Sequence, residues 1–289
     1  MTKYVIISPV RNEELLVEKT LQSVIYQTLR PVEWIMVNDG SEDKTEEIIR
    51  TYQQDNPWIK IINLEDRGFY LPGKGVVETF YKGYDSISVP DWEYVVKLDC
   101  DLNFAPDYFK SIFDRFGKDP KLGIASGCTY LPINGELIKE PTQADHPVGP
   151  SKIYKRECWE QINGLKPIPG WDLADLLAAQ MNGWKTACFF DLKLTHHRLT
   201  GSRRKGYWAP KHLQGRFEYR HGYSFFYTSI KSVYHLFTKP VLIGSIAKVT
   251  GYLSAFLNKE EYLFEKDMRI FLRKKHKQNL LGKFSSKNN

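Results

Sequence analysis

The sequence predicts an α/β protein with a parallel sheet flanked by helices and a basic helical C-terminal extension. Over the first two-fifths of the chain, short apolar runs rich in β-branched residues alternate with segments of helical periodicity. The 289 residues are 42% hydrophobic, enough for a full core. Charge is unevenly divided: residues 1–202 carry 23 Lys and Arg against 29 Asp and Glu, a net −6, whereas residues 203–289 carry 18 against 5, a net +13. An acidic body therefore precedes a basic extension.

The elements are expected in a regular order. Strands are predicted at residues 4–10, 33–39, 58–64 and 92–98, with helices within 13–28, 41–54 and 76–87. Repeated strand–helix–strand units with short loops require a parallel sheet with right-handed crossovers. Ser41 is the expected N-cap of the second helix.

The second part of the body is less regular. Helices are predicted at residues 106–118, 155–162 and 172–183, strands at 122–131 and 185–198, and a loop at 132–150. Residues 201–210 form a basic, glycine-containing loop that we expect to be mobile. From about residue 211 onward the pattern changes to long helices with many aromatic side chains.

Some classes of protein are excluded by composition and motif. The four cysteines lie far apart without a CxxC pair, which argues against a zinc site or a disulfide framework and favours a reducing compartment. The first residues have too short an apolar run for a signal peptide. There is no GxGxxG after the first strand and no GxxxxGK[ST], so a classical dinucleotide fold is disfavoured and a Walker-type ATPase is excluded.

The stretch VVKLDCDLN ends an apolar run with two carboxylates two positions apart. On an extended segment, Asp99 and Asp101 point to one side and Cys100 to the other. Crowded carboxylates repel each other, and a cation or a hydrogen-bond network normally offsets that cost. Two oxygen donors at a sheet edge suit Mn²⁺ or Mg²⁺. The alternative is an acidic surface turn.

A second polar group follows the strand at 33–39. Asp39 ends that strand and Gly40 permits a tight turn. The carboxyl ends of parallel strands share one edge of a sheet, so this Asp and the DCD stretch should lie on the same rim. An Asx turn that caps the next helix would use the same residues.

Four motifs in this order, SPVRNEE, VNDGSEDKT, KLDCD and GWDLADLLAAQMNGW, resemble those of the family-2 glycosyltransferases with a GT-A fold. The resemblance spans about residues 4–198. It implies a Rossmann-like, mostly parallel mixed sheet in a catalytic domain of residues 1–202, with a nucleotide-sugar half of about 1–103 and an acceptor half of about 104–202. Residues 203–289 would be the extension.

The resemblance also implies roles for individual residues. The base and ribose of a nucleotide sugar would be held by Pro9, Arg11, Glu13 and Asp39. Lys74 resembles the family's basic residue near the nucleotide or its phosphates. Asp99 would lie near the ribose or the waters of a Mn²⁺ or Mg²⁺ ion, and Asp101 would bind the metal directly.

The last motif departs from the family pattern. The family usually has Glu-Asp at the catalytic position, where this chain has Trp171-Asp172. Asp172 keeps the single base that an inverting transfer needs, and Trp171 could stack on a sugar. Asp175, one turn later, is a second candidate for the base or a surface carboxylate.

The segment THHRLTGSRRK closes the last strand of the body. His196 or His197 could complete the metal shell, and strand alternation from Asp191 favours His197. Three arginines could grip the diphosphate: Arg198, Arg203 and Arg204. One histidine packed under the sheet, and arginines on lipid headgroups, are the alternative.

The segment 240–257 has an amphipathic pattern. An apolar stripe includes Leu242, Ile246 and Phe256, and the opposite side carries Lys248 and Gly251. A polar stripe with a central lysine disfavours a spanning helix and favours a helix in a membrane interface, or one packed on the body. Binding to single-stranded nucleic acid is disfavoured because the body is acidic and lacks a nucleic-acid motif. We therefore expect a cytoplasmic protein, peripheral at the inner face of the cell membrane.

The sequence thus favours an inverting, metal-dependent glycosyltransferase. It would move a sugar from a nucleoside-diphosphate sugar to a hydroxyl of a glycan or lipid-linked acceptor, in the synthesis of a cell-surface polysaccharide or glycoconjugate. Two alternatives remain open: a sugar-phosphate nucleotidyltransferase, and a non-catalytic, membrane-associated scaffold that binds nucleotide.

Overall fold

The computed structural model describes residues 2–68, 73–198, 206, 208–234 and 242–285. The chain divides into two compact units, Met1–Leu199 and Thr200–Asn289. The predicted boundary between residues 202 and 203, and most of the basic loop 201–210 with Arg203 and Arg204, lie outside the described residues.

The first unit is built on a mixed sheet. Among the described residues nine strands are joined in the order β3-β2-β1-β4-β8-β6-β9-β5, with β7 added to β6. Strands β1 to β4 run parallel, β8 is antiparallel to both β4 and β6, and β9 is parallel to β6. The predicted mixed, mostly parallel sheet is confirmed. The strands are β1 (Tyr4–Val10), β2 (Glu33–Asp39), β3 (Ile59–Leu64), β4 (Tyr94–Leu98), β5 (Leu102–Phe104), β6 (Leu122–Ile133), β7 (Glu136–Lys139), β8 (Ser151–Lys155) and β9 (Lys185–His196).

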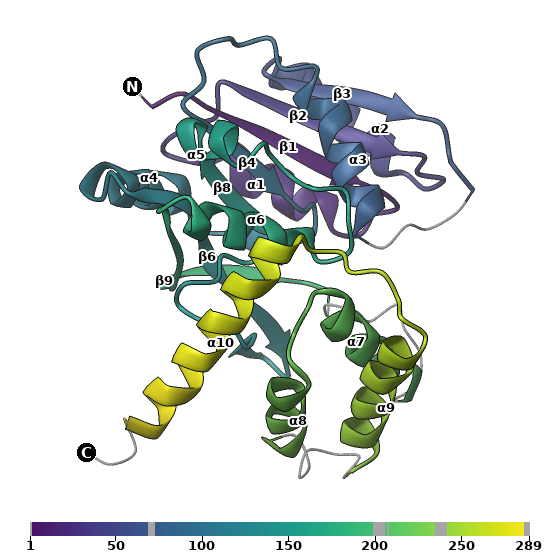
Figure 1. The fold of residues 1–289 in the computed structure, drawn as a ribbon. Helices are drawn as coiled ribbons and strands as arrows, with labels where there is room; N and C mark the ends of the chain where they lie inside the picture. Colours follow the sequence, from purple (N-terminus) through teal and green to yellow (C-terminus); the bar gives the residue numbers. More distant parts are fainter. Residues whose placement is uncertain (1, 69–72, 199–205, 207, 235–241, 286–289) are drawn as a thin grey trace. The chain divides into compact units, whose positions relative to one another are not determined.

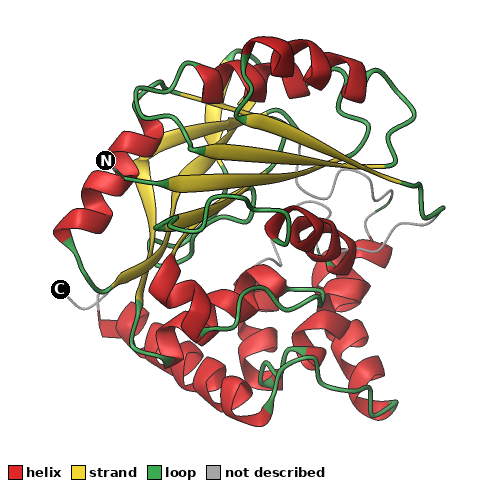
Figure 2. Cartoon of the chain, turned by 90° about the horizontal axis from the view of Figure 1, so that it is seen from above, coloured by secondary structure: helices red, strands yellow, loops and turns green. Residues whose placement is uncertain are grey.

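Helices cover both faces of this sheet. Alternate side chains of β1 enter different cores: Tyr4 and Ile6 pack with α1, α2 and α4, whereas Val5 and Ile7 pack with α3, α5 and α6. Figure 1 shows α3 and α6 on the near side of the strands, and Figure 2 gives the view from above. The helices are α1 (Val17–Ile25), α2 (Thr45–Asp55), α3 (Lys74–Tyr84), α4 (Tyr108–Lys118), α5 (Arg156–Gln161) and α6 (Trp171–Met181).

The sheet order brings the predicted polar groups to one edge. Strand β1 lies between β2 and β4, and all three run in the same direction. Asp39 ends β2 and Asp99 directly follows β4. The two motifs therefore share the carboxyl edge of the sheet, as predicted.

Three local features differ from the sequence-based expectations. Strands β5 and β8 were not predicted, and β7 lies inside the segment predicted as a loop. The N-cap prediction for Ser41 is wrong: α2 begins at Thr45, whose backbone N–H and hydroxyl both donate to Asp43. Ser41 Oγ instead accepts a hydrogen bond from the backbone N–H of Asn12 at 3.0 Å. This bond links the turn after β2 to the turn after β1.

The second unit is helical in its described part. It contains α7 (Trp208–Arg220), α8 (Phe225–Tyr234), α9 (Ile243–Leu257) and α10 (Lys266–Ser285). Helices α7 and α9 touch through backbone: a Cβ on Gly215 would lie 1.8 Å from the carbonyl oxygen of Lys248. In the described part of the chain, no helix combines the length and apolarity needed to cross a bilayer.

Candidate active site

The end of β4 places a lysine against the first aspartate of the DCD motif. Lys97 is 3% exposed, and its ammonium donates to Asp99 Oδ1 and, at 3.1 Å, to the carbonyl oxygen of Gly149. Removal from water raises the pKa of the Asp99 carboxyl, and the Lys97 ammonium opposes that shift. Part of the crowding in DCD is therefore offset by a cation that the chain itself supplies.

The second aspartate has an oxygen without a partner. Asp101 is 8% exposed, and its buried Oδ1 accepts no hydrogen bond from any described residue. Burial would raise its pKa, but the imidazole of His196 and the guanidinium of Arg198 hold it below its ordinary range. An ionised carboxylate with a free buried oxygen is suited to a divalent cation.

The two histidines at the end of β9 have different partners. His196 lies between two carboxylates, with Nε2 3.4 Å from Asp101 Oδ2 and Nδ1 3.0 Å from Glu140 Oε2. Burial alone would lower the pKa of His196, but these carboxylates raise it to about 9. His197 Nε2 lies 2.6 Å from Asn103 Oδ1, and its backbone N–H donates to the carbonyl of Asp101.

The described side chains do not form a complete metal cage. No group of three His, Cys, Asp or Glu side chains within the described ranges is arranged to hold a metal ion. A cation at Asp101 would need most of its ligands from water or from a diphosphate, which is usual for Mg²⁺ in nucleotide sites. The residues present therefore fit a metal site whose ligands come partly from the protein and partly from water or a bound nucleotide, better than a structural metal site formed by the protein alone.

At the end of β2, Asp39 is held by an arginine that sequence reasoning missed. Arg67 Nη2 donates to Asp39 Oδ1 at 2.7 Å and to the Thr79 hydroxyl at 2.9 Å, and Arg67 Nη1 lies 3.3 Å from Glu78. A signal was available: Arg67 follows β3, which is parallel to β2 and ends at the same edge.

The first motif joins this group through its arginine. Arg11 Nη1 donates to the carbonyl oxygen of Asp39 at 3.1 Å, and Arg11 Nη2 lies 2.8 Å from Asp66 Oδ1. Pro9 is half-buried in β1, where it pairs with Val37 of β2. Polar groups of the β1, β2 and β3 ends thus form one connected set.

Glu13 forms an ion pair with Arg198, which lies 185 residues later in the sequence. Arg198 binds it through two hydrogen bonds, of 2.7 and 2.6 Å. The backbone N–H of Glu13 also donates a hydrogen bond to the hydroxyl of Thr45, the first residue of α2, at 2.8 Å. A forked pair of this kind is geometrically specific, so it holds Arg198, two residues after the end of β9, against the turn that follows β1.

Lys74 begins α3 and lies close to the turn before α6. Its side chain is half exposed and 3.5 Å from Glu78. The preceding Gly73 has φ +76°, and a Cβ there would lie 2.9 Å from Pro169 Cα. The start of α3 and the turn before α6 are therefore in backbone contact.

Asp172 lies in the first turn of α6, next to a buried Trp171. The carboxylate is partly exposed, and a Cβ on Gly149 would lie 3.7 Å from Asp172 Oδ2. The carbonyl of the same glycine accepts the hydrogen bond from Lys97. Gly149 therefore connects the lysine beside the DCD motif to the predicted base.

Trp171 is 7% exposed and belongs to the core beneath α6. The ammonium groups of Lys97 and Lys152 lie 5.3 and 5.4 Å from the centre of its ring. Such distances are typical of cation–π contacts. Its burial therefore supports packing against these two lysines over stacking on a sugar.

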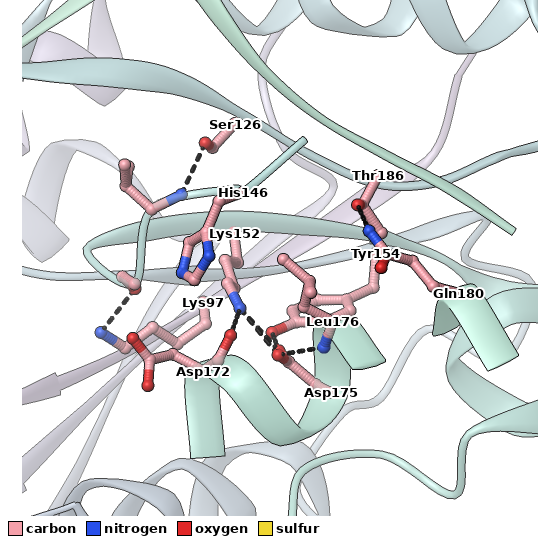
Figure 3. A network of polar contacts seen from close by, with 12 residues as sticks. Lys97, Ser126, His146, Lys152, Tyr154, Asp172, Asp175, Leu176, Gln180 and Thr186 are labelled. Atoms are coloured by element: carbon pink, nitrogen blue, oxygen red, sulfur yellow. Dashed lines mark hydrogen bonds and ion pairs between the residues drawn. The ribbon is translucent and has the colours of Figure 1, made fainter. Parts of the chain in front are cut away.

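Beneath α6 lies a buried ion pair (Figure 3). Lys152 and Asp175 are fully buried, with Lys152 Nζ 2.7 and 3.0 Å from the two carboxylate oxygens. Lys152 also donates to the carbonyl oxygen of Asp172 at 2.5 Å, and the Tyr154 hydroxyl donates to Asp175. The expectation of a surface carboxylate at Asp175 is wrong. The residue instead anchors the turn that carries Asp172.

Comparison with known proteins identifies the family. Residues 5–170 match the model of Glycosyl transferase family 2, which is more than half of the chain. The chain belongs to glycosyl transferase family 2. It is therefore a family-2 glycosyltransferase enzyme, and the nucleotidyltransferase alternative falls away.

Among curated proteins, this glycosyltransferase is 32% identical over 179 residues to the uncharacterized glycosyltransferase YkcC of Bacillus subtilis, covering 57% of the chain and 53% of that protein. It is 33% identical over 116 residues to the poly-β-1,6-N-acetyl-D-glucosamine synthase of Staphylococcus epidermidis, covering 40% of the chain and 26% of the synthase. The matched region therefore spans about a quarter to a half of these relatives.

Solved structures show the same fold. The glycosyltransferase resembles S. aureus TarS 1–349 with a TM-score of 0.55 at 14% identity, over 90% of this chain and 73% of that one. The mannosyltransferase PcManGT from Pyrobaculum calidifontis gives 0.55 at 16%, over 96% and 80%. GalNAc-T7 gives 0.59 at 14%, over 88% and 54%. These likenesses confirm the predicted GT-A fold.

Proposed function

We propose that the chain transfers a sugar from a nucleoside-diphosphate sugar to a hydroxyl of a glycan or lipid-linked acceptor, with inversion at the anomeric carbon, in the synthesis of a cell-surface polysaccharide or glycoconjugate. The observation that carries the proposal is the unpartnered, buried Oδ1 of Asp101, on the edge that also holds Asp39 and Asp99. Structural neighbours support the donor class: a solved form of TarS holds UDP-GlcNAc, and PcManGT holds GDP-Man with Mn²⁺.

In this proposal the donor lies along the carboxyl edge. Asp39, with Arg11 and Arg67 around it, receives the base and ribose, and the polar set formed by these residues is largely preorganised. Pro9 and Glu13 shape the same turn, and Lys74 meets the phosphates. A bound Mn²⁺ or Mg²⁺ ion on Asp101 would supply positive charge to the leaving diphosphate.

Asp172 is the proposed base. It removes the proton of the acceptor hydroxyl as the hydroxyl oxygen forms a bond to the anomeric carbon and the bond to the diphosphate oxygen breaks. Lys152 supports this role because it binds the carbonyl oxygen of Asp172 and leaves the carboxylate free to face Gly149. Only one protein carboxylate is needed at the reacting carbon, unlike the pair used by glycosidases.

The test is release and transfer of sugar with a panel of UDP-, GDP- and dTDP-sugars, with and without Mn²⁺. We expect one donor to be hydrolysed slowly in a manganese-dependent way. Asp172→Asn should lower turnover by about 10²- to 10⁴-fold, the range of general base catalysis, and leave nucleotide affinity near that of the unaltered chain. Equal loss of turnover and affinity would instead assign Asp172 a structural role, and no turnover with any donor would contradict the proposal.

His197 remains the proposed third metal ligand, although the His196 imidazole lies 3.4 Å from Asp101 Oδ2 and the His197 imidazole contacts Asn103 Oδ1. Paired variants distinguish them. If His197 binds the ion, His197→Ala should weaken Mn²⁺ binding more than His196→Ala, measured by titration of the metal in the presence of UDP. A larger effect of His196→Ala would move the assignment to His196.

A further inference from the structure

Helices α8 and α9 of the second unit expose large apolar side chains and bury polar ones, the reverse of the pattern in an ordinary globular domain. On α9 the buried positions include Ser245, Lys248 and Gly251, whereas Ile246 and Phe256 are 50% and 57% exposed. The apolar stripe of the sequence therefore faces outward, and polar and small side chains, together with Tyr252, face inward. A soluble helix normally does the reverse.

The same inversion occurs on α8. Thr228 and Ser232 are 0% and 4% exposed, whereas Phe225, Phe226 and Val233 are 46%, 69% and 59% exposed. Two neighbouring helices with the same inversion form a surface, because α8 and α9 are in contact: the Phe225 and Tyr252 rings lie 5.5 Å apart, and Ser245 Oγ donates to the Ser232 carbonyl oxygen at 2.8 Å.

A buried carboxylate on α7 holds this arrangement. Glu218 is 5% exposed, and its oxygens lie 2.7 Å from the Thr228 hydroxyl, 2.9 Å from Lys231 Nζ and 2.8 Å from Lys248 Nζ. Burial would raise the pKa of Glu218, but the two ammonium groups hold it below its ordinary range. Turning the apolar stripe of α9 inward would remove Lys248 from this carboxylate and leave Lys231 to offset the buried charge of Glu218.

Close backbone contact fixes the same side of α9. A Cβ on Gly251 would lie 1.9 Å from the carbonyl oxygen of His212, and Gly215 meets the Lys248 carbonyl in the same way. Only glycine allows two helices to approach so closely. The inward face of α9 is therefore specified at three points, and its outward apolar face is a consequence of that specification.

We propose that the exposed apolar faces of α8 and α9 dock on a bilayer surface containing anionic lipids. Charge favours this occupant: residues 203–289 carry a net +13, and exposed lysines lie at both ends of α9, with the Lys211 side chain 3.6 Å from a Cβ on Gly244 and Lys259 after the last turn. Exposed apolar side chains on a strongly basic segment are the combination expected of an interfacial helix. Docking does not depend on which donor sugar is used.

The experiment is co-sedimentation of the full chain with vesicles of phosphatidylcholine, with and without phosphatidylglycerol, over a series of salt concentrations. We expect binding only with the anionic lipid and weaker binding as salt rises. The double variant Ile246→Ser with Phe256→Ser should bind about tenfold more weakly or worse, because each lost side chain removes a substantial apolar contact.

A matched control is Leu137→Ser on β7 of the first unit, because Leu137 has a similar exposed fraction of 47%. It should bind vesicles like the unaltered chain. The double variant should also keep the helix content of the unaltered chain, since the replaced side chains face outward.

Two outcomes would overturn the proposal. Equal vesicle binding by the double variant and the unaltered chain would place the contact elsewhere. Absence of vesicle binding, together with conversion from dimer to monomer by the double variant in sedimentation velocity, would assign the faces to a second copy of the chain.

Discussion

Helices α1 and α4 of the first unit and helices α8 and α9 of the second differ in the side on which their apolar side chains lie. In the first unit, α1 and α4 turn Leu21 and Ile112 into the core with no exposed area. In the second, α9 turns Ile246 outward and buries Lys248. Both arrangements are amphipathic and differ only in which face meets the protein. Amphipathicity alone therefore does not predict burial; the polar partners available on the neighbouring helix decide it.

Each unit also contains a buried pair of lysine and carboxylate, and the two pairs differ in their surroundings. Lys152 and Asp175 are fully enclosed beneath α6. Glu218 is shared between Lys231 and Lys248, and the Lys231 side chain is 34% exposed. The first pair supports a catalytic turn. The second holds the polar sides of α8 and α9 against α7, so the apolar sides of these two helices face outward.

The largest effect is expected from breaking the enclosed pair. Asp175→Leu should destabilise the first unit by about 3–5 kcal/mol, because it leaves Lys152 buried without a countercharge. Replacing both partners, Lys152→Met with Asp175→Leu, should recover much of that loss. Urea unfolding of the three proteins measures this, and equal loss in the single and double variants would show that the pair is not coupled.

The difference between the buried apolar face of α4 and the exposed apolar face of α9 can be tested by replacing an isoleucine on each. Ile112→Ala should cost about 2–5 kcal/mol because Ile112 lies in a packed core. Ile246→Ala should change stability by about 0.5 kcal/mol or less, as at other surface positions. Hydrogen exchange, read separately over α4 and α9, reports both. A comparable cost at Ile246 would mean that its face is packed in solution.

The smallest effect concerns pH. The pKa of Glu218 is lowered in the folded chain: burial opposes the shift and the Lys231 and Lys248 charges cause it. Its stabilising contribution is therefore complete above the ordinary value of 4.5 and is lost as pH falls through the lower, folded value. Asp175 has the opposite sign, because burial raises its pKa above 3.8, so ionising it as pH rises through the folded value costs stability.

The Glu218→Gln variant isolates this dependence. The difference in hydrogen-exchange protection of α7 and α9 between the variant and the unaltered chain should shrink as pH is lowered below about 4.5. A difference that stays constant with pH would mean that Glu218 acts through shape rather than charge.

Much of the first unit was predictable because its information is local. Alternating apolar runs and helical periodicity specify the parallel strands, and strand ends specify the rim where Asp39 and Asp99 meet. The ordered motifs then led to the family. The apolar stripe of α9 was also visible in the sequence, although its outward direction was not.

The rest depends on contacts between distant segments. Strand β8, SKIYK, carries lysines and reads as polar, yet Lys152 is fully buried because Asp175, 23 residues later, compensates its charge. Arg67 reaches Asp39 across the β2–β3 edge, although 28 residues separate the two in the sequence. Such pairings are set by tertiary geometry, which no local pattern encodes.

The contact between Gly73 and Pro169 limits how two segments of the candidate site can move relative to each other. Because a single extra carbon at Gly73 would overlap Pro169, the helix that presents Lys74 has no freedom to shift toward the turn that presents Asp172. A shift of the first turn of α3 in that direction would press directly on the segment before α6. The two segments that present Lys74 and Asp172 therefore meet backbone to backbone at this point.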